Sequence, residues 1–188
     1  MPIYDIIERI FSSYRARSIA ALQLKPHERV LIVGAGTGLD LPHLSTEQAA
    51  IAAIDLTPAM VNKLKRKAKK LNLAVEAQVM NAQQLDFKDE SFDAVILHLI
   101  VAVVPDPVQC LQEVARVLKP EGRFTMMDKF ITAGQKPSLY RRSLNLVTRV
   151  LFTDINRDVD ILLAQVPLEK QVDEPLFSIF RLVQGIRP

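Results

Sequence analysis

The sequence predicts a three-layer α/β fold, in which helices cover both faces of a mostly parallel, seven-stranded sheet. Strand and helix patterns alternate from residue 30 onward, as they do in βαβ units. Several strands are almost continuously apolar, which is typical of strands covered on both faces. The last two apolar segments are joined by a short loop, which favours an antiparallel hairpin at the sheet edge. The expected strands span residues 30–33, 50–54, 74–80, 92–97, 123–128, 169–173 and 177–184.

Helical periodicity marks the segments between the strands and also the start of the chain. Residues 3–23 are expected to form an amphipathic helix before the sheet, with an apolar side made of Ile3, Ile6, Ile7, Ile10, Phe11 and Tyr14. An apolar stripe over residues 60–71 predicts a second helix. The pair Asp106-Pro107 starts a third, because an acid suits the N-cap and proline suits the first turn. We expect a turn at residues 120–122 to end that helix, and two more helices near residues 141–151 and 156–165.

Length and composition suit one globular domain. We divide its 188 residues into an N-terminal helix or lid (1–24), a core (25–130) and a C-terminal part with helices and the edge hairpin (131–188). The single cysteine, Cys110, excludes an internal disulfide, favours a reducing compartment and is expected to be inert. Without a signal-peptide pattern or a membrane-spanning run, we expect a cytoplasmic protein, with peripheral membrane contact as an option. The net charge of +3 permits an anionic partner without requiring one.

A glycine-rich segment after the first strand is the strongest functional signal. Gly34, Gly36 and Gly38 follow an apolar strand and let the backbone pass close beneath a ligand. We expect a helix to begin directly behind them, with an N-terminus that favours a carboxylate or phosphate. Asp55 ends the second strand, 21 residues after Gly34, where an acid suits the two hydroxyls of a ribose.

The spacing of these glycines separates two cofactor classes. A nicotinamide-binding loop, G-x-G-x-x-G, would need glycine at the position of Leu39. The pattern found here, G-x-G-x-G, resembles the first motif of class I (Rossmann-like) S-adenosylmethionine-dependent methyltransferases. Asn81-Ala82 and the segments 91–95 and 117–123 follow in the order that this family shows. The resemblance covers residues 25–130, and the layout is similar to that of bacterial phospholipid N-methyltransferases and small-molecule methyltransferases.

The resemblance implies S-adenosyl-L-methionine as cofactor and S-adenosyl-L-homocysteine as product. No metal requirement is expected, because no cluster of metal-ligating residues is visible in the sequence. The glycine loop would pass beneath the methionine part of the cofactor, Asp55 would bind the ribose, and Leu56 and Met60 would flank the adenine. Asn81 and the Ala82 amide would bond the adenine, and His98 would lie near the sulfonium. The implied cofactor-binding residues are Gly34, Ala35, Gly36, Thr37, Gly38, Asp55, Leu56, Met60, Asn81, Ala82 and His98.

Two positions depart from the family pattern. Many members carry an acid where this chain has Ile32, and many carry aspartate where it has Asn81. The amide oxygen of Asn81 still accepts a hydrogen bond, so the change there is a loss of charge. Asp40 could replace the missing acid, although capping the following helix is its expected role. Both departures concern the affinity for the cofactor rather than its identity.

Several of these residues also have a purely structural interpretation. Asp55 could cap the helix before Pro58, a role compatible with ribose binding. His98 could be a hydrogen-bonded residue at the end of a buried strand, although we favour a contact with cofactor or substrate. The run at residues 63–70 holds six cations in eight residues; a solvated helix face is the expected interpretation, and a membrane-surface or nucleic-acid patch is the alternative.

The acceptor is expected to be a small molecule or a lipid, with a phospholipid amine as one option. No Asn/Asp-Pro-Pro-Tyr segment follows the fourth strand and no separate target-recognition domain is evident, so nucleic acid is not the expected substrate. The N-terminal helix either packs on the sheet or covers the cofactor, and in the second case helps to select the acceptor. Substrate-site candidates are Tyr4, Tyr14, Tyr140, Arg141 and Arg142, because arginine suits a phosphate head group. His98 and Tyr14 are the only candidates for a catalytic group, and a non-catalytic binding module of the same fold is the alternative function.

Overall fold

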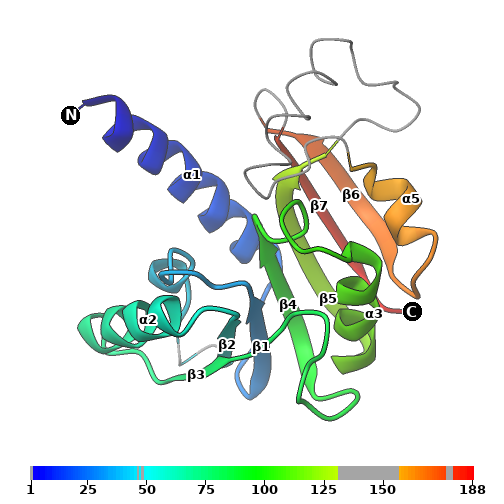
Figure 1. Cartoon of the computed structure of the whole chain (residues 1–188), viewed down its shortest axis with the longest axis horizontal. Coiled ribbons are helices and arrows are strands. Elements are labelled where there is room, and N and C mark those ends of the chain that lie inside the picture. The colour runs from blue at the N-terminus through cyan, green and yellow to red at the C-terminus, as the bar shows by residue number, and fades with distance from the viewer. Residues whose placement is uncertain (1, 46, 48, 131–156, 177–179) are drawn as a thin grey trace.

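The computed structural model describes residues 2–45, 47, 49–130, 157–176 and 180–188, and for residues 2–10 it describes the course of the backbone only. These residues form a seven-stranded sheet with the strand order β3-β2-β1-β4-β5-β7-β6 (Figure 1). The strands are β1 (Glu28–Val33), β2 (Ala49–Asp55), β3 (Val75–Val79), β4 (Phe92–His98), β5 (Leu118–Lys129), β6 (Glu169–Pro175) and β7 (Phe180–Ile186).

Strand direction follows the predicted pattern. The pairs β1/β2, β1/β4, β2/β3 and β4/β5 are parallel, while β7 runs antiparallel to both β5 and β6. The mostly parallel sheet and the antiparallel hairpin at its edge are therefore confirmed. The chain reverses its strand order between β1 and β4, and a sheet of this kind binds ligands in the crevice at the carboxyl ends of those strands.

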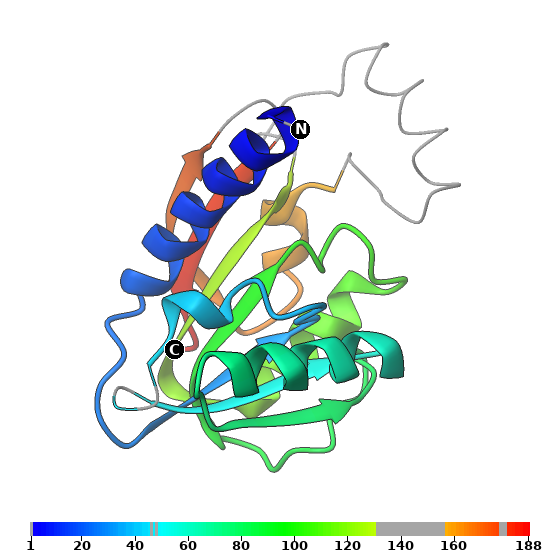
Figure 2. The ribbon, with the colours of Figure 1, turned by 90° about the vertical axis from the view of Figure 1, so that its left-hand side faces the viewer.

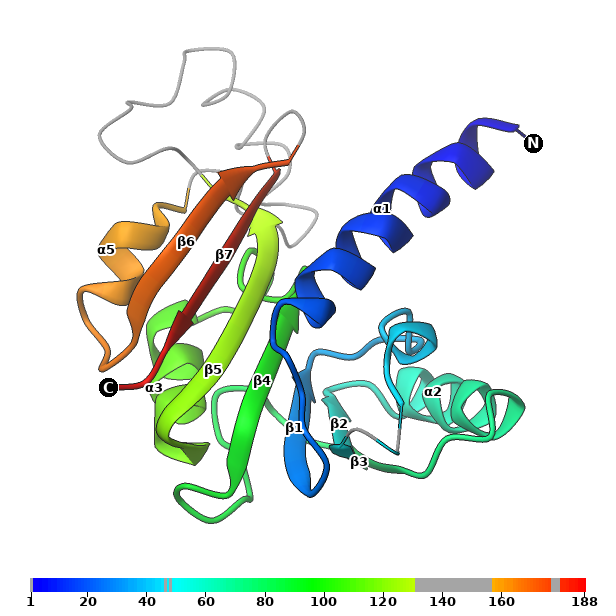
Figure 3. The ribbon, with the colours of Figure 1, turned by 180° about the vertical axis from the view of Figure 1, so that it is seen from behind.

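The helices cover both faces of the sheet. On one face lie α1 (Pro2–Ala20), the 3₁₀ turn η1 (Leu41–His43) and α2 (Pro58–Lys70); on the other lie α3 (Pro107–Val117) and α5 (Val159–Leu163). Figures 1 and 3 show α1 leaving the sheet at an angle, with its first turns projecting beyond the strands, and Figure 2 shows the same helix from its own side, in front of the sheet. The expected helix near residues 141–151 lies outside the described residues. No helix in the described part of the chain has the length and apolar character needed to cross a bilayer.

Residue type explains the central strands and the start of α3. Val30, Leu31, Ile32 and Val33 are at most 1% exposed, so β1 has the continuous apolar character of a strand buried on both faces. The predicted cap of α3 is confirmed, since the Asp106 carboxylate accepts a hydrogen bond from the Gln109 amide at 3.0 Å.

Three local predictions are wrong. Among the described residues between the glycine loop and β2, η1 is the only helical element, and a three-residue turn provides no helix dipole for an anion. Asp40 stands at the N-cap position of η1 but makes no side-chain capping bond. The turn at residues 120–122 does not separate α3 from the next strand either: β5 starts at Leu118, directly after α3, and Glu121 takes a φ of +60° within that strand.

Candidate cofactor-binding site

The glycine loop has the backbone conformation that its sequence predicts. Gly34, Gly36 and Gly38 have φ values of +68°, +54° and +79°, a region that disfavours side chains. A Cβ atom at Gly34 would lie 2.8 Å from the Ile100 side chain, and one at Gly38 would lie 2.7 Å from Leu64 Cδ1. A Cβ atom at Gly36 would meet no atom of the described residues within 4 Å, so in this part of the chain the loop is packed at both ends and open in the middle.

Asp55 connects this loop to the end of β2. Its two carboxylate oxygens accept hydrogen bonds from the Gly36 and Thr57 amides, each at 2.9 Å. The Ala35 amide also donates to the Ile54 carbonyl at 2.8 Å, so the loop is fastened to β2 at two consecutive residues. Each carboxylate oxygen has a second lone pair available for a ligand hydroxyl.

A cavity of about 240 Å³ lies at the carboxyl ends of β1, β2 and β3. It brings together five of the sequence-predicted residues, namely Gly34, Asp55, Leu56, Asn81 and Ala82. Ile54, Met80, Ile100, Val103, Val104 and Pro105 complete its lining. Leu56 and Val103 are 68% and 41% exposed, although both are apolar, which gives the cavity two apolar side chains suited to a flat ring. Ala35, Gly36, Thr37, Gly38 and Met60 do not line this cavity.

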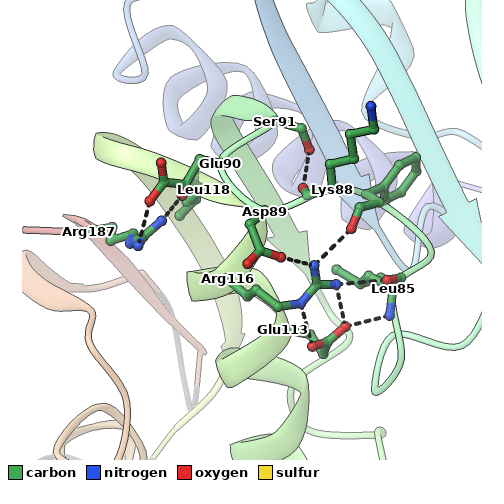
Figure 4. A network of polar contacts seen from close by, with 10 residues as sticks. Leu85, Lys88, Asp89, Glu90, Ser91, Glu113, Arg116, Leu118 and Arg187 are labelled. Atoms are coloured by element: carbon green, nitrogen blue, oxygen red, sulfur yellow. Dashed lines mark hydrogen bonds and ion pairs between the residues drawn. The ribbon is translucent and has the colours of Figure 1, made fainter.

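The wall that carries Asn81 is held in place by α3. The Asn81 amide oxygen accepts from the Gln83 amide at 3.0 Å and keeps one lone pair for a ligand. Further along the segment, the Arg116 guanidinium donates to the Leu85 and Phe87 carbonyls, each at 2.8 Å, and pairs with Glu113 (Figure 4). The hydrogen bonds from Arg116 lower the pKa of Glu113 and keep it ionised.

The wall between β4 and α3 depends on two residues that sequence reasoning missed. The fully buried Asp128 carboxylate accepts from the Ala102 amide at 2.8 Å, and Arg157 donates to the Val101 and Val104 carbonyls. Burial raises the pKa of Asp128. The wall begins at Leu99, whose φ of +62° is unusual for a side chain of its size. One sequence signal could have indicated Asp128, because it is an acid at the end of an apolar strand, in the run Met127-Asp128-Lys129.

His98 lies outside the cavity. Its imidazole has no exposed surface and lies 2.6 Å from Asp40 and 2.8 Å from Ser18. The cavity lining instead includes Ile100, two residues further along the chain. A direct contact of the His98 side chain with cofactor or substrate, and a role as general base, have no support from this geometry.

Asp40 does not line the cavity either. Burial by itself raises the pKa of this carboxyl, but the charges and hydrogen bonds of His98 and Arg15 outweigh burial and bring the pKa down to about 2. Ile32 stands where many family members carry an acid; it has no carboxylate and is 1% exposed. Neither Asp40 nor Ile32 therefore supplies a carboxylate to the cavity.

The candidate acceptor residues are only partly described. Tyr14 is half-buried on α1, while for Tyr4 only the backbone is described. Tyr140, Arg141 and Arg142 lie outside the described residues. Cys110 is buried on α3, and burial raises the pKa of its thiol to about 12, which agrees with an inert cysteine. Among the described residues, no group of three or more His, Cys, Asp or Glu could hold a metal ion; independence from metals stays a prediction.

These residues fit the proposed cofactor. The open space at Gly36, the carboxylate at the end of β2 and the Asn81 oxygen between apolar side chains match the methionine, ribose and adenine parts of S-adenosylmethionine. With the strand order and the antiparallel β7, they define the class of Rossmann-like S-adenosylmethionine-dependent methyltransferases.

Comparison with known proteins identifies the family. Residues 31–126 match the model of the methyltransferase domain, which is half of the chain, and the chain belongs to that family. It is 36% identical to a phosphatidylethanolamine N-methyltransferase of Cereibacter sphaeroides, over 68% of this chain and 64% of the relative. It is 31% identical to a ubiquinone/menaquinone biosynthesis C-methyltransferase of Geotalea daltonii, over 68% of this chain and 58% of the relative. The chain thus spans about three fifths of the length of these two relatives.

A solved structure supports the fold. Geranyl diphosphate C-methyltransferase from Streptomyces coelicolor, crystallised with Mg²⁺, geranyl diphosphate and S-adenosyl-L-homocysteine, superposes with a TM-score of 0.81. The alignment covers 96% of this chain and 81% of the other, at 16% sequence identity. At that identity the likeness concerns the fold alone.

Proposed function

We propose that this protein transfers a methyl group from S-adenosylmethionine to a small-molecule or lipid acceptor by in-line displacement. The observation that carries this proposal is the cavity that joins the glycine loop to Asp55 and Asn81 at the reversal point of the sheet. The bound cofactor supplies an electrophilic methyl group, and the protein has to align the acceptor and exclude water.

Each wall of the cavity has a defined task in this proposal. Asp55 accepts hydrogen bonds from the ribose hydroxyls, and Asn81 accepts one from the adenine amino group. The Ala82 amide donates to the ring, which Leu56 and Val103 flank. The space above Gly36 takes the methionine part, because no side chain of the described residues comes within 4 Å of a Cβ atom placed there.

The same geometry favours an acceptor that needs little help from a base. The imidazole of His98 is fully buried, so it cannot take a proton from a substrate in the cavity. A primary or secondary amine is protonated at neutral pH, so it first releases one proton to water, then attacks the methyl group through its lone pair, and releases a second proton to water afterwards. An amine is therefore the acceptor that we propose, as the head group of a phospholipid or as a small molecule.

Two observations support a phospholipid amine. The first is the similarity to a phosphatidylethanolamine N-methyltransferase. The second is the charge of α2, which carries six cations and no acid. In the described part of the chain, none of these cations forms an ion pair. The chain has 24 basic and 21 acidic residues, so its charge changes from +3 to −3 when α2 is set aside. Such a face suits peripheral contact with an anionic membrane.

A transfer assay with labelled S-adenosylmethionine tests the proposal. Phosphatidylethanolamine in anionic vesicles should accept label, phosphatidylcholine in matched vesicles should not, and soluble ethanolamine tests the small-molecule option. Asp55→Ala is the control for the site. Calorimetry with S-adenosylmethionine and S-adenosylhomocysteine, read together with the transfer assay, distinguishes an enzyme from a non-catalytic binding module. Absence of binding would reject the proposed cofactor site, whereas binding without transfer to any amine would favour the module.

A further inference from the structure

The second half of α1 is fastened to the cofactor-binding core by a buried polar network. The Arg15 Nη1 donates to Asp40 Oδ1 at 2.5 Å, and His98 Nδ1 lies 2.6 Å from the same oxygen. The Ser18 Oγ lies 2.8 Å from His98 Nε2. The Arg15, Asp40 and His98 side chains are 7%, 4% and 0% exposed. We call Arg15, Ser18, Asp40 and His98 the α1 latch.

Hydrogen-bond roles fix the protons of the latch at Asp40. Arginine only donates, and an ionised carboxylate only accepts. Asp40 Oδ1 therefore accepts from both Arg15 and the Nδ1–H of His98. The 3.3 Å contact between Arg15 Nη1 and His98 Nδ1 joins two donors, so it contributes no hydrogen bond. Within the described part of the chain, the buried Nε of Arg15 has no hydrogen-bond partner, and the ion pair of Nη1 with Asp40 anchors this guanidinium.

The other side of His98 ends a chain of hydrogen bonds that leads to β5 and β7. The Gln184 side-chain amide donates to Thr125 Oγ1 at 3.3 Å, and the Thr125 hydroxyl can donate to Ser18 Oγ at 2.7 Å. The Ser18 hydroxyl lies 2.8 Å from His98 Nε2 and, because a hydroxyl both donates and accepts, it can bond this nitrogen in either direction. Each member of this chain therefore has a hydrogen-bond partner.

The latch joins α1 to two segments near the cavity, the chain just after the glycine loop and the end of β4. Asp40 follows the loop by two residues, and His98 immediately precedes Leu99, where the backbone turns at a φ of +62° towards Ile100 in the cavity wall. Ser18 and Arg15 belong to α1, whose first half projects beyond the strands. One network thus connects α1 with the glycine loop and with the start of the β4–α3 wall.

We propose that Arg15, Ser18, Asp40 and His98 are positioning residues, which hold α1, the glycine loop and the end of β4 in one fixed arrangement so that the cofactor and the acceptor side meet correctly. This inference rests on the proposed function, because it assigns the purpose of the arrangement. A hydrolytic triad is the competing interpretation of the order Ser18, His98, Asp40. Ser18 is 0% exposed and its oxygen already contacts Thr125, so no substrate reaches it.

Arg15→Met and Arg17→Met form a matched pair of variants for the test. Both residues lie on α1, but Arg17 is 53% exposed and pairs only with Glu174 in the described structure. Arg15→Met should weaken S-adenosylhomocysteine binding in calorimetry by at least fivefold and raise KM for the cofactor. It should also accelerate hydrogen exchange of the amides in residues 34–38. Arg17→Met should change none of these. Adding Asp40→Asn to Arg15→Met should restore part of the affinity, since it removes the unpaired charge.

The outcomes separate the latch from a merely structural contact. Equal effects of Arg15→Met and Arg17→Met, or lower stability with unchanged affinity and loop exchange, would overturn the inference. If Arg15→Met does not fold, Ser18→Ala removes a single hydroxyl and must produce the same pattern with a smaller change. If the unaltered protein binds no S-adenosylhomocysteine, the proposed function fails, and the latch is then decided by loop exchange in the two arginine variants.

Discussion

Asp55→Ala is the most informative single substitution, because this carboxylate has a role before any ligand binds. It accepts hydrogen bonds from the Gly36 and Thr57 amides at 2.9 Å and thereby holds the glycine loop against β2. Hydrogen bonds to a charged group contribute roughly 1.5–3 kcal/mol each when buried, and less at a half-buried site. We therefore expect the free energy of unfolding to fall by about 1–3 kcal/mol in urea denaturation.

The loss of cofactor affinity should exceed this structural effect. Removing the ribose acceptor should weaken S-adenosylhomocysteine binding by at least about tenfold, roughly 1.4 kcal/mol, and loosening of the loop adds to it. Calorimetry with an analogue that lacks both ribose hydroxyls distinguishes the two contributions. The analogue should bind the unaltered protein more weakly than S-adenosylhomocysteine does, while Asp55→Ala should no longer discriminate between the two ligands. Unchanged affinity of Asp55→Ala, or equal discrimination by both proteins, would refute the assignment.

Four further outcomes are expected. Gly38→Ala should lower the free energy of unfolding by about 1–3 kcal/mol more than Gly36→Ala, because of these two positions it is the Cβ at 38 that meets packed side chains. Urea denaturation of both variants measures the difference, and equal losses would contradict the packing argument. With burial raising the pKa of its thiol to about 12, Cys110 should resist iodoacetamide at pH 8 until urea is added, as mass spectrometry can show. The pKa of Asp40 falls from 3.8 to about 2 on folding, so its contribution to stability is complete above about pH 4 and disappears towards pH 2; Asp40→Asn should flatten that part of the stability profile. Deleting residues 2–10 should preserve cofactor binding but change KM for the acceptor, and unchanged kinetics would reject the lid.

The parallel sheet was predictable because the residue types of its strands indicate burial on both faces. Continuous apolar runs specify strands covered on both faces, and parallel strands bring their carboxyl ends to one edge of the sheet. That rule alone places Gly34, Asp55 and Asn81 around a common cavity, although they are far apart in the sequence. The absence of a helix after the glycine loop also had a signal. Only ten residues separate Gly38 from Ala49, too few for a helix of ordinary length and two connections.

The α1 latch could not be found in the same way. Ser12, Arg15 and Ser18 lie three residues apart on a helix whose periodicity was judged from its apolar residues, and isolated polar residues there look solvent-facing. Their partners come from distant segments, so the network depends on tertiary packing. Asp40 and His98 each have a common local explanation, a cap and a strand end. Only the folded arrangement shows that one carboxylate serves both α1 and β4.

The latch also restricts how α1 could act as a lid. If the whole helix swung away, Asp40 would lose Arg15 and remain buried beside His98, and breaking a buried ion pair in this way costs about 3–5 kcal/mol. That is a large fraction of the stability of a small domain. Bending near Ser12 avoids this cost, because its contact with His43, at 3.2 Å, is only partly buried. Any opening should therefore be confined to the turns before Ser12, with Arg15 and Ser18 as the fixed base of the lid.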